Sequence, residues 1–243
     1  MFISKSIPLG LLVLCLYHNS AIGASPLSHS CFSPENYTAD SPYGANLNLL
    51  FNLLYTKVPP TGFALDSTGH GQNQVHGMAL CRGDVSEKNC NTCVVDAGKE
   101  LHQRCAYNKG AVIWYDHCLL KYSDVSFFGQ IDYANRFSMS NVQEVDQNGT
   151  LFNEKVKELL SELSNESSDA NPKLYATGEL QLDTVTTLYG IAQCTRDLSG
   201  INCKKCIDGA ISELPNCCGA KRGGRVVGGS CNVGFELYPI VGT

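Results

Sequence analysis

Histidine is scarce in this sequence and is missing from its second half. All six histidines precede residue 120, and no Gly-x-Ser-x-Gly segment supplies a serine nucleophile beside them. A hydrolase with a serine or cysteine nucleophile needs an adjacent base, so this class of enzyme is excluded for the second half. The carboxylates Asp116 and Glu236 have no visible sequence partner for the paired acid chemistry of glycoside hydrolysis. We therefore expect no enzymatic activity, no cofactor and no metal.

The chain also lacks a surplus of positive charge and a second long apolar run. Acidic residues outnumber basic ones by 23 to 18, which argues against a nucleic-acid-binding surface. The one long apolar run, from Ile7 to Tyr17, is shorter than the roughly 20 residues that span a bilayer. Lys5 precedes this run and small residues close it near Ala24, so residues 1–24 have the pattern of a secretory signal peptide. We expect an exported protein without a membrane span.

Cysteine, in contrast, is abundant and regularly spaced. The spacing C-x8-C-x2-C occurs twice, and in each copy eleven residues lead to a fourth cysteine and twelve more to a fifth. The two copies are Cys81, Cys90, Cys93, Cys105, Cys118 and Cys194, Cys203, Cys206, Cys218, Cys231. Removing Cys15 with the signal peptide leaves twelve of the thirteen cysteines, an even number suited to an oxidising compartment. The repeated register indicates a tandem duplication, with domains at residues 27–130 and 135–243.

Both copies carry the same order of predicted elements. A helix with Ser41 as N-cap and Pro42 as its first residue opens the first copy, and Thr150 is the predicted cap of its counterpart. Two short strands follow, then a second helix with a serine cap, then an alternating hairpin, with room for one short strand at the start. Helices on one face of an antiparallel sheet give an α+β fold in two tandem domains. The linker, residues 123–148, contains phenylalanines and is predicted to pack against the domains.

The cysteines are interpreted as disulfides. Structural zinc sites also use C-x2-C pairs, but this chain is exported and each pair has a further cysteine nine residues upstream. A redox C-x-x-C would need a reactive thiolate in a thioredoxin-like context. The position of each pair on a helix beside the strands predicts Cys81–Cys90, Cys93–Cys118, Cys194–Cys203 and Cys206–Cys231, which leaves Cys31 for Cys105. The adjacent Cys217 and Cys218 either form a vicinal bridge or stay free.

The residues around these cysteines resemble the cysteine-rich secretory repeat of land plants. The resemblance lies in the cysteine register and in the runs Cys81–Ser86, Ile113–Asp116, Tyr189–Thr195 and Gly223–Val227. This repeat is the ginkbilobin-type or stress-antifungal domain, which also forms the tandem ectodomain of cysteine-rich receptor-like kinases and plasmodesmata-located proteins. The resemblance covers the whole mature chain. It implies, for each domain, two helices on a five-stranded antiparallel sheet with three disulfides.

The resemblance also implies a candidate mannose site in the second copy. In ginkbilobin the sugar is bound by an Asn after the first cysteine, an Arg six residues before the last cysteine and a Glu five residues after it. Counted from Cys231, Arg225 and Glu236 occupy the last two positions, and matching the opening helices places Asn141 within a residue of the first. The corresponding residues of the first copy are Phe32, Val112 and Ser123. The first copy should therefore not bind mannose.

Alternatives stay open for this site and for the protein. Arg225 and Glu236 can instead form a cross-strand ion pair that supports the sheet, and such a pair can also pre-organise a sugar site. The leading hypothesis is a secreted, non-enzymatic defence or stress protein of the apoplast that binds mannose-containing glycans and has an antifungal effect. The alternative is an apoplastic protein-interaction module that docks on receptor ectodomains or on a second copy of itself. Sequons at Asn36, Asn148 and Asn165 fit a glycoprotein that is exported.

Overall fold

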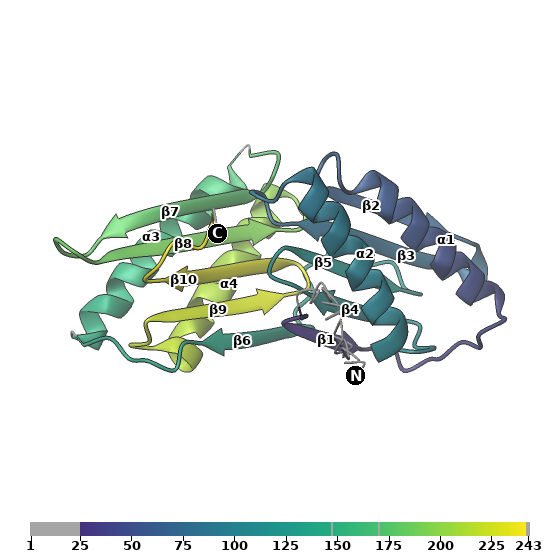
Figure 1. Cartoon of the computed structure of the whole chain (residues 1–243), viewed down its shortest axis with the longest axis horizontal. Helices are drawn as coiled ribbons and strands as arrows, with labels where there is room; N and C mark the ends of the chain where they lie inside the picture. The colour runs from purple at the N-terminus through teal and green to yellow at the C-terminus, as the bar shows by residue number, and fades with distance from the viewer. Residues whose placement is uncertain (1–24, 147, 170, 242–243) are drawn as a thin grey trace, which may run out of the picture.

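The structure, a computed structural model, describes residues 25–146, 148–169 and 171–241. The predicted signal peptide with Cys15 lies outside the described residues. Two domains lie side by side, and each is a sheet with two helices against one face (Figure 1). In this view the helices of the first domain lie in front of their sheet and those of the second lie behind theirs. The predicted α+β fold is confirmed. Among the described residues, no helix is both long and apolar enough to cross a bilayer.

The first domain contains five strands, two α-helices and one short 3-10 turn. These are β1 (Ser28–Cys31), α1 (Pro42–Lys57), β2 (Phe63–Thr68), η1 (Gly71–Asn73), β3 (Val75–Cys81), α2 (Glu87–Arg104), β4 (Ala111–Trp114) and β5 (Cys118–Ser123). The strands pair antiparallel in the order β1-β4-β5-β3-β2. Ser41 caps α1 and Ser86 caps α2, because each side-chain oxygen accepts a hydrogen bond from a backbone N–H in the first turn. Both caps give these helices the starts that the sequence predicts.

The second domain repeats this topology. Its elements are β6 (Arg136–Ser140), α3 (Gly149–Ser168), β7 (Tyr175–Gln181), β8 (Thr187–Cys194), α4 (Gly200–Cys218), β9 (Gly223–Gly228) and β10 (Cys231–Glu236), with strand order β6-β9-β10-β8-β7. Ser199 caps α4, but the predicted cap of α3 is wrong. Asn148 takes that position, and its Oδ1 accepts hydrogen bonds from the backbone N–H groups of Thr150 and Leu151. Asn and Thr are both good caps, so the sequence did not discriminate between two positions this close.

Each domain has its own apolar core between its helices and its sheet. In the first domain Leu47, Leu50 and Leu54 of α1 are fully buried against β3 and α2. In the second domain Val156, Leu159 and Leu163 of α3 pack in the same way. Burying a leucine side chain contributes roughly 1.5–3 kcal/mol, so these helices are stabilised mainly by their contacts with the sheet.

Disulfides fasten the second helix of each domain to its sheet. Cys81 and Cys118 are register partners at one end of β3 and β5, and α2 presents Cys90 and Cys93 one turn apart. Two bonds from one helix can therefore reach neighbouring strands. The disulfides are Cys31–Cys105, Cys81–Cys90, Cys93–Cys118, Cys194–Cys203, Cys206–Cys231 and Cys217–Cys218. The last is a vicinal bond at the end of α4.

The linker between the domains is packed, as predicted. Each sheet has an open face, which is the face that its helices leave uncovered. On the open face of the first sheet, Trp114 belongs to a small core that also includes Val227 of the second domain, with Phe127 of the linker packed against it. The ring of Trp114 also contacts Phe137 of β6, with centroids 5.2 Å apart, and its Nε1 donates a hydrogen bond to the carbonyl of Gly228 at 2.9 Å. The first sheet therefore has little open face left for a ligand.

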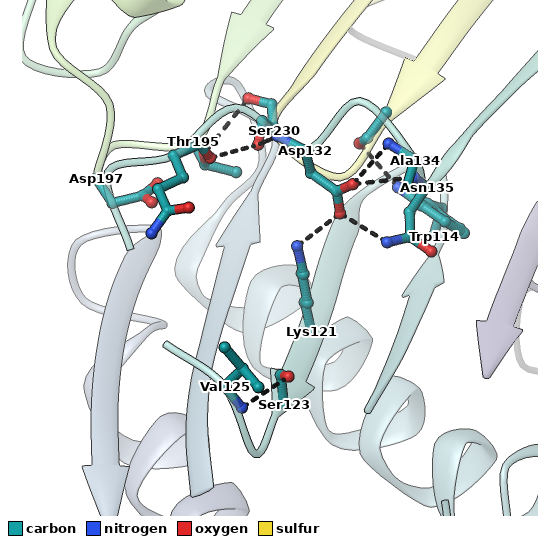
Figure 2. A network of polar contacts seen from close by, with 12 residues as sticks. Trp114, Lys121, Ser123, Val125, Asp132, Ala134, Asn135, Thr195, Asp197 and Ser230 are labelled. Atoms are coloured by element: carbon teal, nitrogen blue, oxygen red, sulfur yellow. Dashed lines mark hydrogen bonds and ion pairs between the residues drawn. The ribbon is translucent and has the colours of Figure 1, made fainter. Parts of the chain in front are cut away.

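A polar network lies beside this small core (Figure 2). Lys121 of β5 points at Asp132 of the linker, and the two form an ion pair of 2.6 Å with side chains only 5% and 9% exposed. The other oxygen of Asp132 accepts hydrogen bonds from the backbone N–H groups of Ala134 and Asn135. The backbone N–H of Asp132 donates to the hydroxyl of Ser230, in the β9–β10 turn. One linker residue thus joins both domains.

Candidate functional site

The candidate sugar-binding residues lie on the open face of the second sheet. Neighbouring residues Val226 and Phe235 belong to the core on the helix side. Because side chains alternate along a strand, Arg225 and Glu236 point to the opposite face. Arg225 is the register partner of Gly234, and Glu236 is the register partner of Gly223. The two side chains are therefore diagonal neighbours on β9 and β10.

Two glycines make room for these side chains. The carboxylate of Glu236 lies directly over Gly223, where any Cβ would collide with it. The stem of Arg225 lies over Gly234, and a Cβ there would come within 2.7 Å of its Cγ. Each functional side chain is thus laid against the backbone of the neighbouring strand, which holds it close to the sheet. Alanine at either glycine would displace the side chain above it.

Asn141 lies at the same end of the sheet. It directly follows β6, the strand that pairs with β9, and its backbone N–H donates to the carbonyl of Gly223 at 2.9 Å. Its Oδ1 accepts a hydrogen bond from the backbone N–H of Gln143, which leaves its amide Nδ2 available. The three candidate residues, Asn141, Arg225 and Glu236, therefore lie on or beside three adjacent strands, near Gly223.

Arg225 makes its ion pair across the domain junction and not with Glu236. Its Nη1 lies 2.7 Å from Oδ1 of Asp116, in the turn between β4 and β5 of the first domain. The side chain of Arg225 is 17% exposed and that of Asp116 is 53% exposed. The alternative of a direct cross-strand ion pair is therefore not what the structure has, although the charge of Arg225 still acts on its diagonal neighbour Glu236. Sequence reasoning missed Asp116, although it lies in the run Ile113–Asp116 that supported the family resemblance.

Glu236 is an unusual carboxylate for a protein surface. It is only 8% exposed, and its Oε2 has no hydrogen-bond partner among the described residues. Burial raises the pKa of Glu236, and the charge of Arg225 and the hydroxyl of Tyr238 offset only part of this effect. A buried acceptor without a donor costs roughly 1–3 kcal/mol, so its retention calls for a physical explanation.

Apolar groups border this polar cluster. Tyr238 follows β10 and is 54% exposed, while its pKa is raised by burial and by the charge of Glu236. Met139, the register partner of Arg225 on β6, is 39% exposed, and Val142 beside Asn141 is 90% exposed. An aromatic ring with a polar tip beside hydrogen-bonding groups suits a ligand that has both an apolar face and hydroxyls.

The equivalent place in the first domain is closed. Val112 and Ser123 point to the open face of the first sheet, and they are 0% and 6% exposed. Val112 belongs to the small core at the junction, and Phe32 and Phe127 pack against that core. The first domain therefore differs from the second both in its residues and in what covers them.

The three sequon asparagines are exposed in the structure. Asn36 lies between β1 and α1, where its Oδ1 accepts a hydrogen bond from Asn108. Asn148 caps α3 through its Oδ1, and Asn165 lies near the end of the same helix. None of the three is one of the candidate sugar-binding residues Asn141, Arg225 and Glu236.

The chain is similar to known proteins over nearly its whole length. The family described as salt stress response/antifungal matches residues 30–125 and 138–238. An antimicrobial ginkbilobin-2-like protein of Castanea crenata is 65% identical over 241 residues, with 99% of each chain covered. Cysteine-rich repeat secretory protein 38 of Arabidopsis thaliana is 52% identical over 219 residues, which cover 89% of this chain and 86% of that protein.

Two solved structures with the same fold are tandem ectodomains. The tandem DUF26 ectodomain of the Arabidopsis thaliana cysteine-rich receptor-like protein PDLP8 has a TM-score of 0.78 and 24% identity, covering 88% of this chain and 98% of that one. The corresponding ectodomain of PDLP5 has a TM-score of 0.73 and 26% identity, covering 88% and 99%. The arrangement of two five-stranded sheets with two helices each is thus shared with these ectodomains.

Proposed function

This chain belongs to the salt stress response/antifungal family of secreted, cysteine-rich proteins, and from that premise we propose that it binds mannose-type glycans through its second domain. The observation that carries the proposal is the state of Glu236. Its buried carboxylate oxygen lacks a donor among the described residues, beside the guanidinium of Arg225 and near Asn141. A sugar hydroxyl is a donor of the right kind for this oxygen.

The three side chains offer complementary hydrogen bonds to vicinal hydroxyl groups. Glu236 accepts, Arg225 donates through N–H groups that Asp116 does not occupy, and the amide Nδ2 of Asn141 donates. Asp116 holds the guanidinium from the first domain, so the site needs both domains in place. Tyr238 provides an apolar surface for the face of the pyranose ring.

The proposed role is binding without catalysis, outside the cell. One relative is named an antimicrobial protein and another a secretory protein, and these names support a defence or stress role in the apoplast with an antifungal effect. Recognition of mannose-rich glycans on a fungal surface would connect the site to that role.

Calorimetric titration of the secreted form with mannose tests the proposal. Saturable binding is expected, and Arg225→Ala or Glu236→Ala should weaken it by about tenfold or more, since each removes a charge-assisted hydrogen bond. Glu179→Ala is the matched control, because Glu179 is exposed on the same face but lies on the edge strand β7. No saturable binding, or binding that survives both site substitutions, would refute the proposal.

Protein docking is the second candidate function, and the exposed apolar groups Met139, Val142 and Tyr238 favour it. Exposed apolar side chains that gather at one place often mark an interaction surface. A pull-down of receptor ectodomains tests this candidate. Docking is favoured over sugar binding if the Glu236→Ala variant still recovers them and the Val142→Asp variant does not.

A further inference from the structure

The second domain has a large groove on its helix side, opposite the candidate sugar site. The groove lies between α3 and α4 and has a volume of about 750 Å³. Its floor is formed by the apolar side chains of Val156, Ile211, Leu214 and Phe235. Phe235 reaches the groove from β10, whereas the next residue, Glu236, points to the other face of the sheet. Sites for small molecules typically measure roughly 300–1,000 Å³ and are mostly apolar, so this groove has the dimensions of a binding site.

The first domain shows how the same place between the helices is filled. Tyr55 of α1 lies against Gly98 of α2, where an added Cβ would come within 2.9 Å of Cζ of the ring. Burial raises the pKa of Tyr55 to about 12, because its hydroxyl is packed between the helices. The cysteine register matches Gly98 with Ile211, and the apolar stripes of α1 and α3 match Tyr55 with Ser164. The second domain therefore has a serine where the first has a tyrosine ring.

Further substitutions distinguish the helix pair of the second domain from that of the first. Ser164 is fully buried and donates a hydrogen bond of 2.7 Å to Asp208, and the groove is lined by Ile211, which takes the place of Gly98, and not by Ser164. In the first domain His102 of α2 packs on Phe51, with ring centroids 5.0 Å apart. The residue that matches His102 in the second domain is Pro215, which lines the groove. The side chains between the two helices thus differ between the domains.

The polar rim of the groove has balanced charge. Lys204 pairs with Asp208 at 3.0 Å, and Glu154 and Lys157, which have opposite charges, lie one turn apart on α3. Asn153 also lines the groove, and because its Oδ1 accepts a hydrogen bond from the backbone N–H of Ala220, its amide N–H groups are what it can offer a ligand. An anionic or cationic ligand gains little from such a rim, whereas an apolar ligand with a hydroxyl group matches both floor and rim.

We propose that the α3–α4 groove binds one uncharged, largely apolar molecule that carries a hydroxyl group and has the size of a sterol. This activity is separate from sugar binding, because the two sites lie on opposite faces of the second domain. The chain would then present a glycan site on its open sheet face and a lipid-like site between its helices.

Fluorescence titration with Nile red, an uncharged apolar dye, tests the proposal. The dye should bind saturably at one site per chain, and ergosterol should displace it while the anionic palmitate does not. Ser161→Phe places a ring in the groove and should raise the dissociation constant of ergosterol by about tenfold or more. The matched control is Asn52→Phe, which introduces the same ring at the equivalent position of α1, where Asn52 is exposed, and it should leave binding unchanged.

A second variant keeps the test decisive if the first one folds poorly. Ser164→Tyr with Ile211→Gly recreates the tyrosine–glycine contact of the first domain and should also abolish displacement by ergosterol. The groove variants should bind mannose with the same affinity as the parent protein, because the two sites lie on opposite faces. A failure of the sugar proposal is then seen in the mannose titration, and a failure of the groove proposal in the dye titration. The proposal would be overturned if palmitate displaced the dye and ergosterol did not, or if both groove variants bound ergosterol as the parent does. It would also be overturned if the protein were a dimer that Ser161→Phe dissociates, because the groove would then be an interface between two copies.

Discussion

At the scale of single residues, Glu236 is a carboxylic acid whose charged form is disfavoured by its surroundings. Burial raises the pKa of its carboxyl, and Arg225 and Tyr238 compensate only in part. The pKa of Glu236 in the folded protein lies above its pKa in the unfolded chain. Protonated Glu236 therefore contributes its full stabilisation to the folded protein below the unfolded pKa, and this contribution is lost as pH rises through the folded pKa. Above the folded pKa the charged side chain therefore destabilises the fold, which fits a residue kept for binding.

Glu236→Gln should consequently raise the stability of the protein and lower its proposed affinity for mannose. We expect the free energy of unfolding at pH 7 to rise by about 1 kcal/mol, because the neutral amide avoids burying a charge. The difference from the parent should shrink towards pH 4, and mannose affinity should fall. Glu179→Gln, exposed on the same sheet, should change neither quantity. Denaturant unfolding at both pH values measures this, and a loss of stability at pH 7 would assign the carboxylate a structural role instead.

Residue positions are predictable from the sequence only where a local marker exists. Counting from Cys231 locates Arg225 and Glu236, because a disulfide holds the start of β10 and the hairpin sets the register. Asp116 could not be found in this way. Its contact with Arg225 spans 109 residues and depends on how the two domains pack, which no local spacing records.

At the scale of elements, the order of helices and strands follows from local rules. The serine caps, the proline after Ser41 and the cysteine register locate both helices of the first domain. The α3 cap was missed because Asn148 and Thr150 compete within one turn; the helix begins at Gly149, so Asn148 is the cap and Thr150 already lies inside the helix. The α3–α4 groove was also beyond prediction, since it depends on how side chains of two helices far apart in the sequence pack together.

The paired disulfides give an internal comparison of how cross-links stabilise equivalent elements. In the chain-entropy model, the cost of removing a bridge depends on the loop it closes. Cys81–Cys90 and Cys194–Cys203 both span 9 residues, and replacing either pair by serine should cost about 2.7 kcal/mol. Cys93–Cys118, which spans 25, should cost about 3.5 kcal/mol. Denaturant unfolding measures these losses, and peptide mapping without reduction checks the pairs. A Cys81–Cys93 peptide, or unequal costs for the two short bridges, would contradict this account.

At the scale of the whole molecule, the duplication has given two similar folds with different exposed surfaces. The open face of the first sheet is covered by Phe127 of the linker and by Val227 of the second domain. The open face of the second sheet carries the partly exposed Arg225 and the buried Glu236, and the first domain contributes Asp116 to it. The first domain thus supports the second, and the proposed binding sites both lie in the second.

The strength of that support depends on Asp132 at the junction. Burial by itself would raise the pKa of Asp132, but the hydrogen bonds from Lys121 and from the backbone of Asn135 lower it below the ordinary value. The stabilisation is therefore present above the pKa of an unfolded aspartate, about 3.9, and is lost as pH falls through the folded pKa.

Asp132→Ala should leave Lys121 charged and buried, at a cost of about 3–5 kcal/mol. Because Asp132 joins β5, the linker and the β9–β10 turn, we also expect scanning calorimetry at pH 7 to show two transitions where the parent shows one. Asp66→Ala is the control, since its ion pair with Lys57 is much more exposed than that of Asp132 with Lys121 and should be worth less than about 1 kcal/mol. Mannose affinity should fall in Asp132→Ala, because a loosened junction no longer holds Asp116 against Arg225. A single transition with a loss no larger than that of the control would mean that apolar contacts alone hold the domains together.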